Sequence, residues 1–290
     1  MAEKPLTRWG YDAEETRQVV ASTLSIAVVL GDLLDEVCIV GGLVPTLLID
    51  YGREMTDEGG HCGTNDLDVG LTLAVLDDER YKQIAERLRE AGFGHGETDE
   101  GRAVVQRWTT ENLNVTIDFL IPPVEDEQRG GAIKHLESDF GAIVAPGLPL
   151  AFDERELVDL DGATLAGDRA TRSVPVCGPA AYVVLKALAF RRRGTRKDAY
   201  DPDYVLANWA PGIRDVAERM ARHAATDPDT VAEALAYLRD DYDTIDHVGP
   251  RSVARFLDSG DEDAAAADAR GRVDDLLRAC AELGVRPASH

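Results

Sequence analysis

Thr64-Asn65-Asp66-Leu67-Asp68-Val69-Gly70-Leu71 carries the two acidic residues on which the interpretation of this chain depends. The apolar run around them predicts a strand over 67–73, and side chains alternate along a strand, so Asp66 and Asp68 are expected on one face. Aspartate is disfavoured inside strands, which calls for an explanation. Either the two carboxylates bind a divalent cation, or both lie in a loop where Asp66 caps a turn.

Two glycines, Gly41 and Gly42, stand between a short strand predicted over 37–40 and a helix predicted over 43–51. The start of a helix leaves backbone N–H groups without partners, which is a natural site for an anion. A tight turn that needs positive φ is the alternative explanation. Together with the Asp-x-Asp motif downstream, the glycines favour a turn that approaches a phosphate.

A third aspartate, Asp118, interrupts the apolar run 115–121. A buried lone carboxylate carries a large desolvation cost unless it is paired or bound to a metal; the alternative is that Asp118 faces solvent from an alternating strand. Magnesium typically uses one or two carboxylates together with substrate phosphates, and two ions ~3.5–4 Å apart can hold both the attacking and the leaving oxygen. Asp66, Asp68 and Asp118 are therefore predicted metal ligands for nucleotidyl transfer.

The pattern of the 290-residue chain changes near Gly178-Pro179. Short strands and helices precede this point and only helices follow it, which predicts an α/β domain over 1–176 and a helical domain over 177–290. The acidic, alanine-rich stretch 259–270 is either a solvated helix face or a mobile segment.

The predicted helical domain carries the remaining candidate residues. Lys186 stands in the apolar helix 180–193, so it either extends its amine to the surface or reaches a bound anion. Five of the seven residues from Arg191 to Lys197 are basic, which indicates a phosphate or nucleic-acid contact or a favourable charge at a helix C-terminus. Asp198 and Asp201 follow, three residues apart.

Composition excludes some classes of function. A net charge of −23 argues against broad, non-specific binding of nucleic acid, although a local basic groove stays compatible with it. Few of the basic residues are lysine, so the acidity is either adaptation to salt or a clue to partners. The four cysteines form no Cys-x-x-Cys pair, and we expect a cytoplasmic protein without a secretory leader, a disulfide framework or a membrane span.

The order of these motifs resembles the AbiEii-type nucleotidyltransferase toxin family of the DNA polymerase β-like superfamily. The resemblance covers about residues 37–210. It places the Gly-Gly turn on Gly41 and Gly42, the hydroxyl-and-metal motif on Thr64, Asp66 and Asp68, the helical lysine on Lys186, and the closing acidic motif on Lys197, Asp198 and Asp201. Many members have arginine two positions before the Ser/Thr, where this chain has Cys62.

The resemblance implies a polymerase β-like core, in which a mixed sheet is flanked by helices, and a helical C-terminal lobe. It also implies an enzyme that moves a nucleotide from a nucleoside triphosphate (NTP) to an acceptor hydroxyl and releases pyrophosphate. Magnesium, or manganese in its place, is the implied cofactor; the 3′ end of tRNA is one implied acceptor, and an antitoxin protein is an implied partner.

Roles follow for individual residues under this hypothesis. Asp66, Asp68 and Asp118 are expected to hold metal, with acceptance of the proton from the acceptor hydroxyl as the alternative role of Asp118, and Gly41, Gly42 and Thr64 are expected to seat phosphates. The residues expected to contact the nucleotide are Lys186, Arg193, Arg196, Lys197 and Asp198. Lys186 and Asp201 join the three carboxylates in the predicted catalytic set. Two alternatives stay open at this point. The first is transfer to a small cationic acceptor such as an aminoglycoside, and the second is a non-catalytic protein that binds a nucleotide or a partner.

Overall fold

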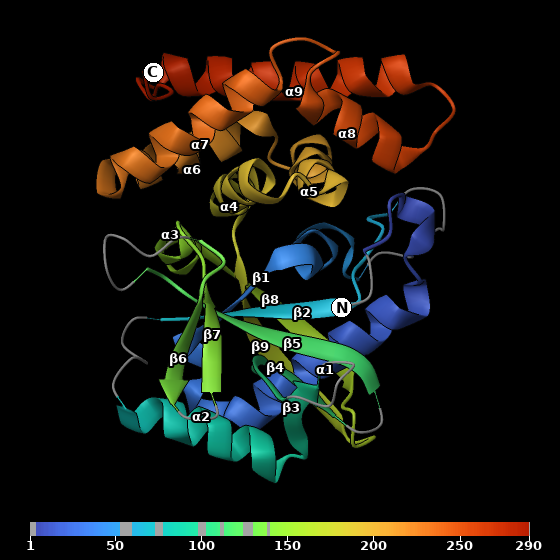
Figure 1. Ribbon diagram of the computed structural model, residues 1–290, viewed down its shortest axis with the longest axis vertical. Coiled ribbons are helices and arrows are strands. Elements are labelled where there is room, and N and C mark those ends of the chain that lie inside the picture. The colour runs from blue at the N-terminus through green and yellow to red at the C-terminus, as the bar shows by residue number, and fades with distance from the viewer. Residues whose placement is uncertain are drawn as a thin grey trace. The chain divides into compact units, whose positions relative to one another are not determined.

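The computed structural model divides the chain into two compact units, each described by itself below (Figure 1). Unit 1 contains Tyr11–Leu47 and Cys62–Cys177, and unit 2 contains Glu3–Gly10, Leu48–His61 and Gly178–His290. The structure describes residues 4–52, 60–72, 78–97, 103–110, 113–123, 130–137 and 140–289. Unit 2 thus takes in two N-terminal segments that the sequence-based division at 176 assigns to the first domain.

Unit 1 is built on a mixed nine-stranded sheet, which agrees with the predicted α/β class. Seven strands follow the order β3-β4-β5-β2-β1-β9-β8, and β7 pairs with both β5 and β6. The strands are β1 (Val37–Val40), β2 (Asp66–Leu71), β3 (Phe93–Glu97), β4 (Ala103–Thr110), β5 (Leu113–Ile121), β6 (Ile133–Glu137), β7 (Phe140–Val144), β8 (Arg155–Ala163) and β9 (Arg169–Cys177).

The centre of this sheet combines parallel and antiparallel pairs. Strand β2 runs antiparallel to β1 and parallel to β5, and β5 in turn pairs antiparallel with β4. Because parallel strands need a crossover connection, β2 and β5 are joined through α2 (Asp78–Glu90), β3 and β4. This connection brings residues about fifty positions apart in the sequence into register.

The longest helix of unit 1 is α1 (Ala13–Leu30), followed by the 3₁₀ segment η2 (Gly31–Glu36). Asp12 caps α1 by accepting hydrogen bonds from the N–H groups of Glu14 and Glu15. The segment 13–36 is long and apolar enough to cross a membrane, but half of its most apolar window is buried within the protein. The helix contacts α2, β5, β8 and β9 of the same unit.

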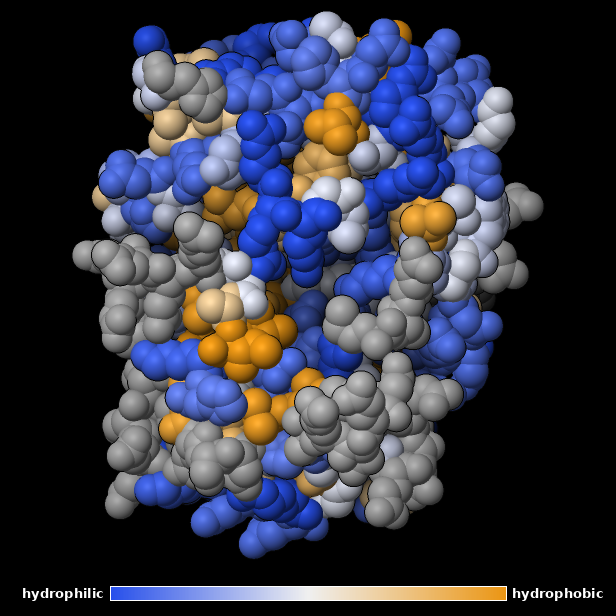
Figure 2. Space-filling model, in the orientation of Figure 1, coloured by the Kyte–Doolittle hydropathy of each residue, from blue (hydrophilic) through white to orange (hydrophobic). Residues whose placement is uncertain are grey.

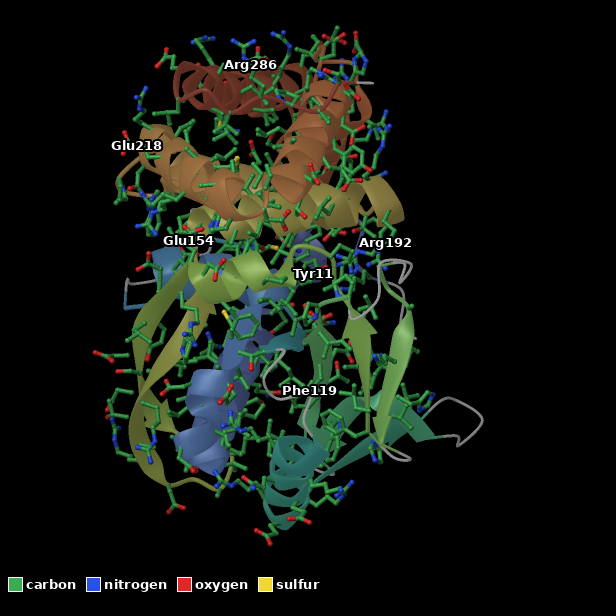
Figure 3. All side chains as sticks on the ribbon, turned by 90° about the vertical axis from the view of Figure 1, so that its left-hand side faces the viewer. Tyr11, Phe119, Glu154, Arg192, Glu218 and Arg286 are labelled. Carbon is green, nitrogen blue, oxygen red and sulfur yellow. The ribbon has the colours of Figure 1, made fainter. Side chains whose placement is uncertain are left out.

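An aromatic cluster fills part of the core of unit 1. Trp108, Phe119 and Phe140 are fully buried, and their ring centroids lie 5.2–6.5 Å apart. Figure 3 labels Phe119 within the sheet. Offset and edge-to-face ring pairs add to the stabilisation from area burial, so this cluster fixes β4, β5 and β7 relative to one another.

Unit 2 is a bundle of helices, and the face of it seen in Figure 2 is mostly hydrophilic, with small separate apolar spots. Its interior contains Val205, Val216, Leu235, Phe256 and Leu276, none of which is more than 4% exposed. The helices are α4 (Pro179–Arg193), α5 (Arg196–Asn208), α6 (Ile213–Thr226), α7 (Pro228–Asp241), α8 (Val248–Leu257) and α9 (Glu262–Glu282).

Three predicted elements differ from the structure in their bounds or geometry. The helix predicted over 43–51 spans Gly41–Asp50, with 3₁₀ geometry over Gly41–Leu43 (η3) and π geometry over Thr46–Asp50 (η4). Helix α5 spans Arg196–Asn208 and includes Pro202, whereas the sequence pattern predicts a helix only from Tyr204 to Trp209. The stretch 259–270 is helical from Glu262 onward, which resolves the alternative of a mobile segment.

Candidate active site

The three predicted metal ligands lie on one face of the sheet of unit 1. Asp66 and Asp68 occupy alternate positions at the start of β2, and both are half-buried. Asp118 stands directly opposite Asp68 on the parallel strand β5. Since residues opposite each other in register point to the same side, the sequence prediction that these carboxylates share a face is confirmed, and the alternative of a loop position for Asp66 and Asp68 is wrong.

The turn after β1 packs directly against Asp68. Val40 is the register partner of Asp68, and Gly41 follows with φ +71°. A Cβ atom added to Gly41 would lie 1.8 Å from Oδ2 of Asp68. Glycine is therefore required here for two reasons: the left-handed backbone and the close approach of the Asp68 carboxylate. Gly42 is buried at the start of the same helical segment.

Thr64 contacts the first carboxylate of the pair. Its Oγ1 donates a hydrogen bond of 2.6 Å to Oδ1 of Asp66, and the backbone N–H of Asp66 approaches the same hydroxyl at 3.4 Å. The side chain thus orients Asp66 rather than standing apart from it. Thr64 is only 2% exposed, so direct contact with a phosphate, which the resemblance implies, stays a prediction.

Asp118 is not a solvent-facing residue. Asp118 is 5% exposed, and its strand neighbours Ile117 and Phe119 are buried as well. Both oxygens of its carboxylate accept hydrogen bonds from Arg107 of β4, at 2.9 Å from Nε to Oδ1 and 2.7 Å from Nη2 to Oδ2. The desolvation cost that identified Asp118 in the sequence is thus offset by an arginine.

Arg107 is a functional candidate that the sequence analysis missed. Its register partner on β5 is Asp118. The hydrogen bond to Asp118 raises the pKa of Arg107, burial acts in the opposite direction, and the charges of Asp118, Asp66 and Asp68 raise it further. When all three carboxylates are ionised, one guanidinium leaves two negative charges on this face.

This donor set fits a divalent cation on Asp66 and Asp68, since magnesium is commonly held by one or two carboxylates plus substrate oxygens. Asp118 fits less well, because Arg107 engages both of its oxygens. Among the residues that the structure describes, the three carboxylates do not bring one oxygen each to within 4.8 Å of the other two. If Asp118 is a metal ligand, as the sequence predicts, its carboxylate must bind the metal ion and Arg107 at the same time.

The predicted residues of unit 2 form a cluster of their own around Asp201. Nζ of Lys186 donates to Oδ2 of Asp201 at 2.7 Å and to Oδ1 of Asp198 at 3.0 Å. Nζ of Lys197 donates to Oδ1 of Asp201 at 2.7 Å. Asp201 is fully buried, and the side chains of Lys186 and Lys197 are less than a tenth exposed. The alternative that Lys186 extends to the surface is therefore wrong.

Asp198 receives further donors at the start of α5. Arg193 forms a bidentate pair with it, at 3.0 Å from Nε to Oδ2 and 2.7 Å from Nη2 to Oδ1. The hydroxyl of Thr195 also donates to Asp198. Planar pairing of this kind is among the stronger hydrogen-bonded ion pairs, so the end of α4 and the beginning of α5 are tied together.

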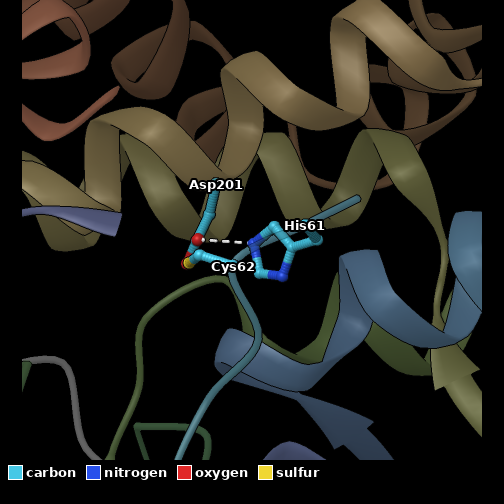
Figure 4. Close-up of side chains that lie close together, drawn as sticks. All are labelled: His61, Cys62 and Asp201. Carbon is cyan, nitrogen blue, oxygen red and sulfur yellow. Dashed lines mark hydrogen bonds and ion pairs between the residues drawn. The ribbon is translucent and has the colours of Figure 1, made fainter. Parts of the chain in front are cut away.

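Two residues from the segment 48–61 complete this cluster, and the sequence analysis assigned a role to neither. Nε2 of His61 lies 2.9 Å from Oδ1 of Asp201 (Figure 4). Asp50 accepts hydrogen bonds from the N–H of His61 at 2.8 Å and from the hydroxyl of Tyr204 at 2.7 Å. We call these residues the Asp201 cluster: Asp50, His61, Lys186, Arg193, Thr195, Lys197, Asp198, Asp201 and Tyr204.

Electrostatics in the Asp201 cluster favour a charged Lys186 and a neutral His61. Burial lowers the pKa of Lys186, but the carboxylates of Asp201 and Asp198 outweigh this effect and the pKa lies above its ordinary value. Burial opposes ionisation of Asp201, yet Lys186 and Lys197 hold its pKa well below the ordinary range. Burial, reinforced by Lys197, lowers the pKa of His61 to about 4. His61 therefore donates from Nε2 to the Asp201 carboxylate.

The charges of the Asp201 cluster balance when its carboxylates are ionised, because Asp50, Asp198 and Asp201 face Lys186, Arg193 and Lys197. Two of the basic residues on either side have separate contacts: Arg191 pairs with Asp241 at 2.5 Å, and Arg196 donates to the backbone oxygen of Leu6 at 3.2 Å. Apart from Arg196, the structure thus brings the predicted residues of unit 2 together in one network of ion pairs, in which only Arg193 is substantially exposed.

Cys62, the position at which many members of the resembling family have arginine, lies in unit 1 and is half-buried. Its Sγ is 3.5 Å from the backbone oxygen of Gly63. Comparison of the chain with protein-family models, with curated proteins and with solved structures finds no match.

Proposed function

We propose that this chain is a metal-dependent nucleotidyltransferase with a polymerase β-like core, and that Asp66 and Asp68 hold its magnesium ion. One observation carries the proposal: Asp66 and Asp68 share a face of β2 beside the Gly41 turn, with Asp118 opposite Asp68 on the adjoining parallel strand. Asp66 and Asp68 are partly exposed, and the three carboxylates of this face outnumber its one arginine. Such a site suits a divalent ion whose coordination shell is completed by substrate oxygens.

Residues of unit 1 would divide the work in the following way. Bound magnesium would neutralise charge on the phosphates of the NTP. Asp66 and Asp68 hold it, Thr64 orients Asp66, and the Gly41 turn sets the position of Asp68. Arg107 donates to both oxygens of Asp118 and fixes its carboxylate, which favours an electrostatic role for Asp118 over acceptance of the proton from the acceptor hydroxyl.

The role of the Asp201 cluster in nucleotide binding stays a proposal from the resemblance. Lys186 and Lys197 already neutralise buried carboxylates, so their charge would act on a phosphate only in part. Arg193 is better placed for contact with a ligand, because 43% of its side chain is exposed.

For the acceptor we propose the 3′ end of tRNA, which follows from the resemblance and brings with it a cytoplasmic location and an antitoxin partner. A second candidate is a cationic small molecule such as an aminoglycoside. The net charge of −23 favours it, since an acidic surface attracts a cation and repels a polyanion.

The test is a transfer assay with each of the four labelled NTPs, with magnesium or manganese, and with either total tRNA or an aminoglycoside mixture as acceptor. We expect label transfer by the unsubstituted protein and at least a hundredfold loss in Asp66→Asn and Asp68→Asn. Asp159→Asn, at an exposed aspartate of β8 in the same unit, should retain activity. Magnesium-dependent NTP binding without pyrophosphate release would instead support a non-catalytic binding protein.

A further inference from the structure

Thr16, in the first turn of α1, contacts the turn that precedes the Asp66–Asp68 pair. Thr16 is 3% exposed. Its Oγ1 accepts a hydrogen bond of 3.2 Å from the backbone N–H of Thr64. The proton of the same hydroxyl can be donated to the backbone oxygen of Thr64, at 3.3 Å, or to that of Asp12, at 3.2 Å. One side chain thus contacts both polar backbone groups of Thr64.

The contact is close enough to restrict the neighbouring residue. Gly63 has φ +81°, and a Cβ atom added to it would lie 1.9 Å from Oγ1 of Thr16. Only glycine satisfies both the backbone conformation and the space. The Gly63-Thr64 turn therefore has room for the Thr16 hydroxyl only because residue 63 is glycine. The buried hydroxyl bonds to the backbone of Thr64 and so links helix α1 to this turn.

The link continues to the metal-binding pair through a second hydroxyl. Thr64, which Thr16 holds by its backbone, donates from its own side chain to Oδ1 of Asp66 at 2.6 Å. Thr16 itself is 3% exposed and Thr64 2% exposed, so water competes little for either interaction. Helix α1, the 63–64 turn and the start of β2 are linked in series by two threonine side chains.

We infer that Thr16 is a positioning residue for the Asp66 carboxylate: it fixes the backbone of Thr64, and through Thr64 it fixes the rotamer of a metal ligand. This inference rests on the proposed function. Groups that hydrogen-bond to metal ligands typically affect metal affinity by 10–100-fold. Loss of the Thr16 hydroxyl should therefore weaken metal binding.

The experiment measures manganese affinity in the absence of nucleotide, by electron paramagnetic resonance of free Mn²⁺, for four full-length variants. Thr16→Val removes the hydroxyl at nearly constant volume, and Thr16→Ser keeps it. Thr23→Val is the matched control, because Thr23 is a buried threonine of the same helix whose hydroxyl bonds only to Val19 of its own helix in the described contacts. Asp66→Asn identifies the Mn²⁺ site that the measurement concerns.

We expect Thr16→Val to weaken Mn²⁺ binding about tenfold and Thr16→Ser to bind within twofold of the unsubstituted protein. Thr23→Val should lower the melting temperature as Thr16→Val does and leave Mn²⁺ affinity unchanged. Unchanged affinity in Thr16→Val, or an equal loss in Thr23→Val, would overturn the inference alone. Absence of an Asp66-dependent Mn²⁺ site in the unsubstituted protein would overturn the proposed function and this inference with it.

Discussion

Arg107 of β4 lies opposite Asp118 of β5 and donates one hydrogen bond to each oxygen of its carboxylate. The pair explains how an acidic side chain can stand in an apolar strand with 5% exposure. The Arg107 guanidinium is also a positive charge on the acidic face of unit 1. When the three carboxylates are ionised, two negative charges are left there for a divalent ion to neutralise.

Replacing Arg107 by methionine should destabilise the protein. Asp118 would keep its buried position without a partner, and breaking a buried ion pair typically costs 3–5 kcal/mol. Because 26% of the Arg107 side chain is exposed, we expect about 2 kcal/mol, measured by urea denaturation. The double variant Arg107→Met, Asp118→Asn should recover part of the loss. Equal stability of Arg107→Met and the unsubstituted protein would contradict this account of the pair.

Gly41→Ala should damage the site more than it damages the fold. The added methyl would meet Oδ2 of Asp68 at 1.8 Å in addition to the strain of φ +71°. Gly92→Ala is the control in the same unit, because Gly92 has φ +85° and its Cβ would meet nothing within 4 Å. We expect both to lose about 1 kcal/mol from backbone strain, and only Gly41→Ala to lose Mn²⁺ affinity and nucleotide transfer. Similar Mn²⁺ affinity in both variants would argue against a role of the turn in placing Asp68.

Lys186→Met tests whether the Asp201 cluster is structural. The substitution removes a buried cation from between Asp198 and Asp201, which should lower the free energy of unfolding by about 3 kcal/mol. Arg278→Met is a suitable control, since the Arg278–Asp275 pair of α9 is more than half exposed and should change stability by less than about 1 kcal/mol. Calorimetry and chemical denaturation would report both values. A Lys186→Met protein of normal stability that fails to bind NTP would show a ligand-binding role instead.

Acidification should destabilise the protein through His61. Its pKa is about 4 in the folded state, against an ordinary value of 6.5, so between these values the unfolded chain binds a proton that the folded chain does not. The free energy of unfolding therefore falls as the pH falls from about 6.5 to 4, by up to roughly 3 kcal/mol. Below that range the lowered pKa of Asp201 continues the loss in the same direction.

Urea denaturation at pH 7, 5.5 and 4.5 measures this effect, and His61→Asn removes it. The variant should be less stable at pH 7 because it gives up the hydrogen bond to Asp201, but its stability should depend less on pH across the interval. Parallel pH curves for the two proteins would mean that His61 titrates normally.

Local patterns predicted the elements on which the site of unit 1 depends. The run 37–40 is a strand with the predicted bounds, and alternation placed Asp66 and Asp68 on one face because that periodicity is a property of any strand. The register that sets Asp118 opposite Asp68 could not be predicted in the same way. It depends on which strands are neighbours, and a crossover connection separates these two by about fifty residues.

The same limit applies to the partners of charged groups. The apolar neighbours of Lys186 left two alternatives, an amine that extends to the surface or one that reaches a bound anion, and Asp198 and Asp201 were singled out by their spacing. Asp50 and His61 were not, because they reach α5 from a segment more than 130 residues earlier in the chain. Arg107 was missed for a related reason: a basic residue in a strand looks solvated until its cross-strand neighbour is known.

Unit 2 is built from three stretches that are far apart in the sequence, and this has a consequence for biosynthesis. During synthesis the segment 48–61 leaves the ribosome before unit 1 is complete, while its hydrogen-bond partners Tyr204 and Asp201 emerge only after the last strand of the sheet. Domains tend to fold as they emerge, so unit 1 can fold first. The segment 48–61 can pack only after the C-terminal helices have been synthesised. A fragment that starts at Gly178 would lack this segment, and recombinant expression of the helical bundle should therefore retain residues 48–61, for example by a fused copy.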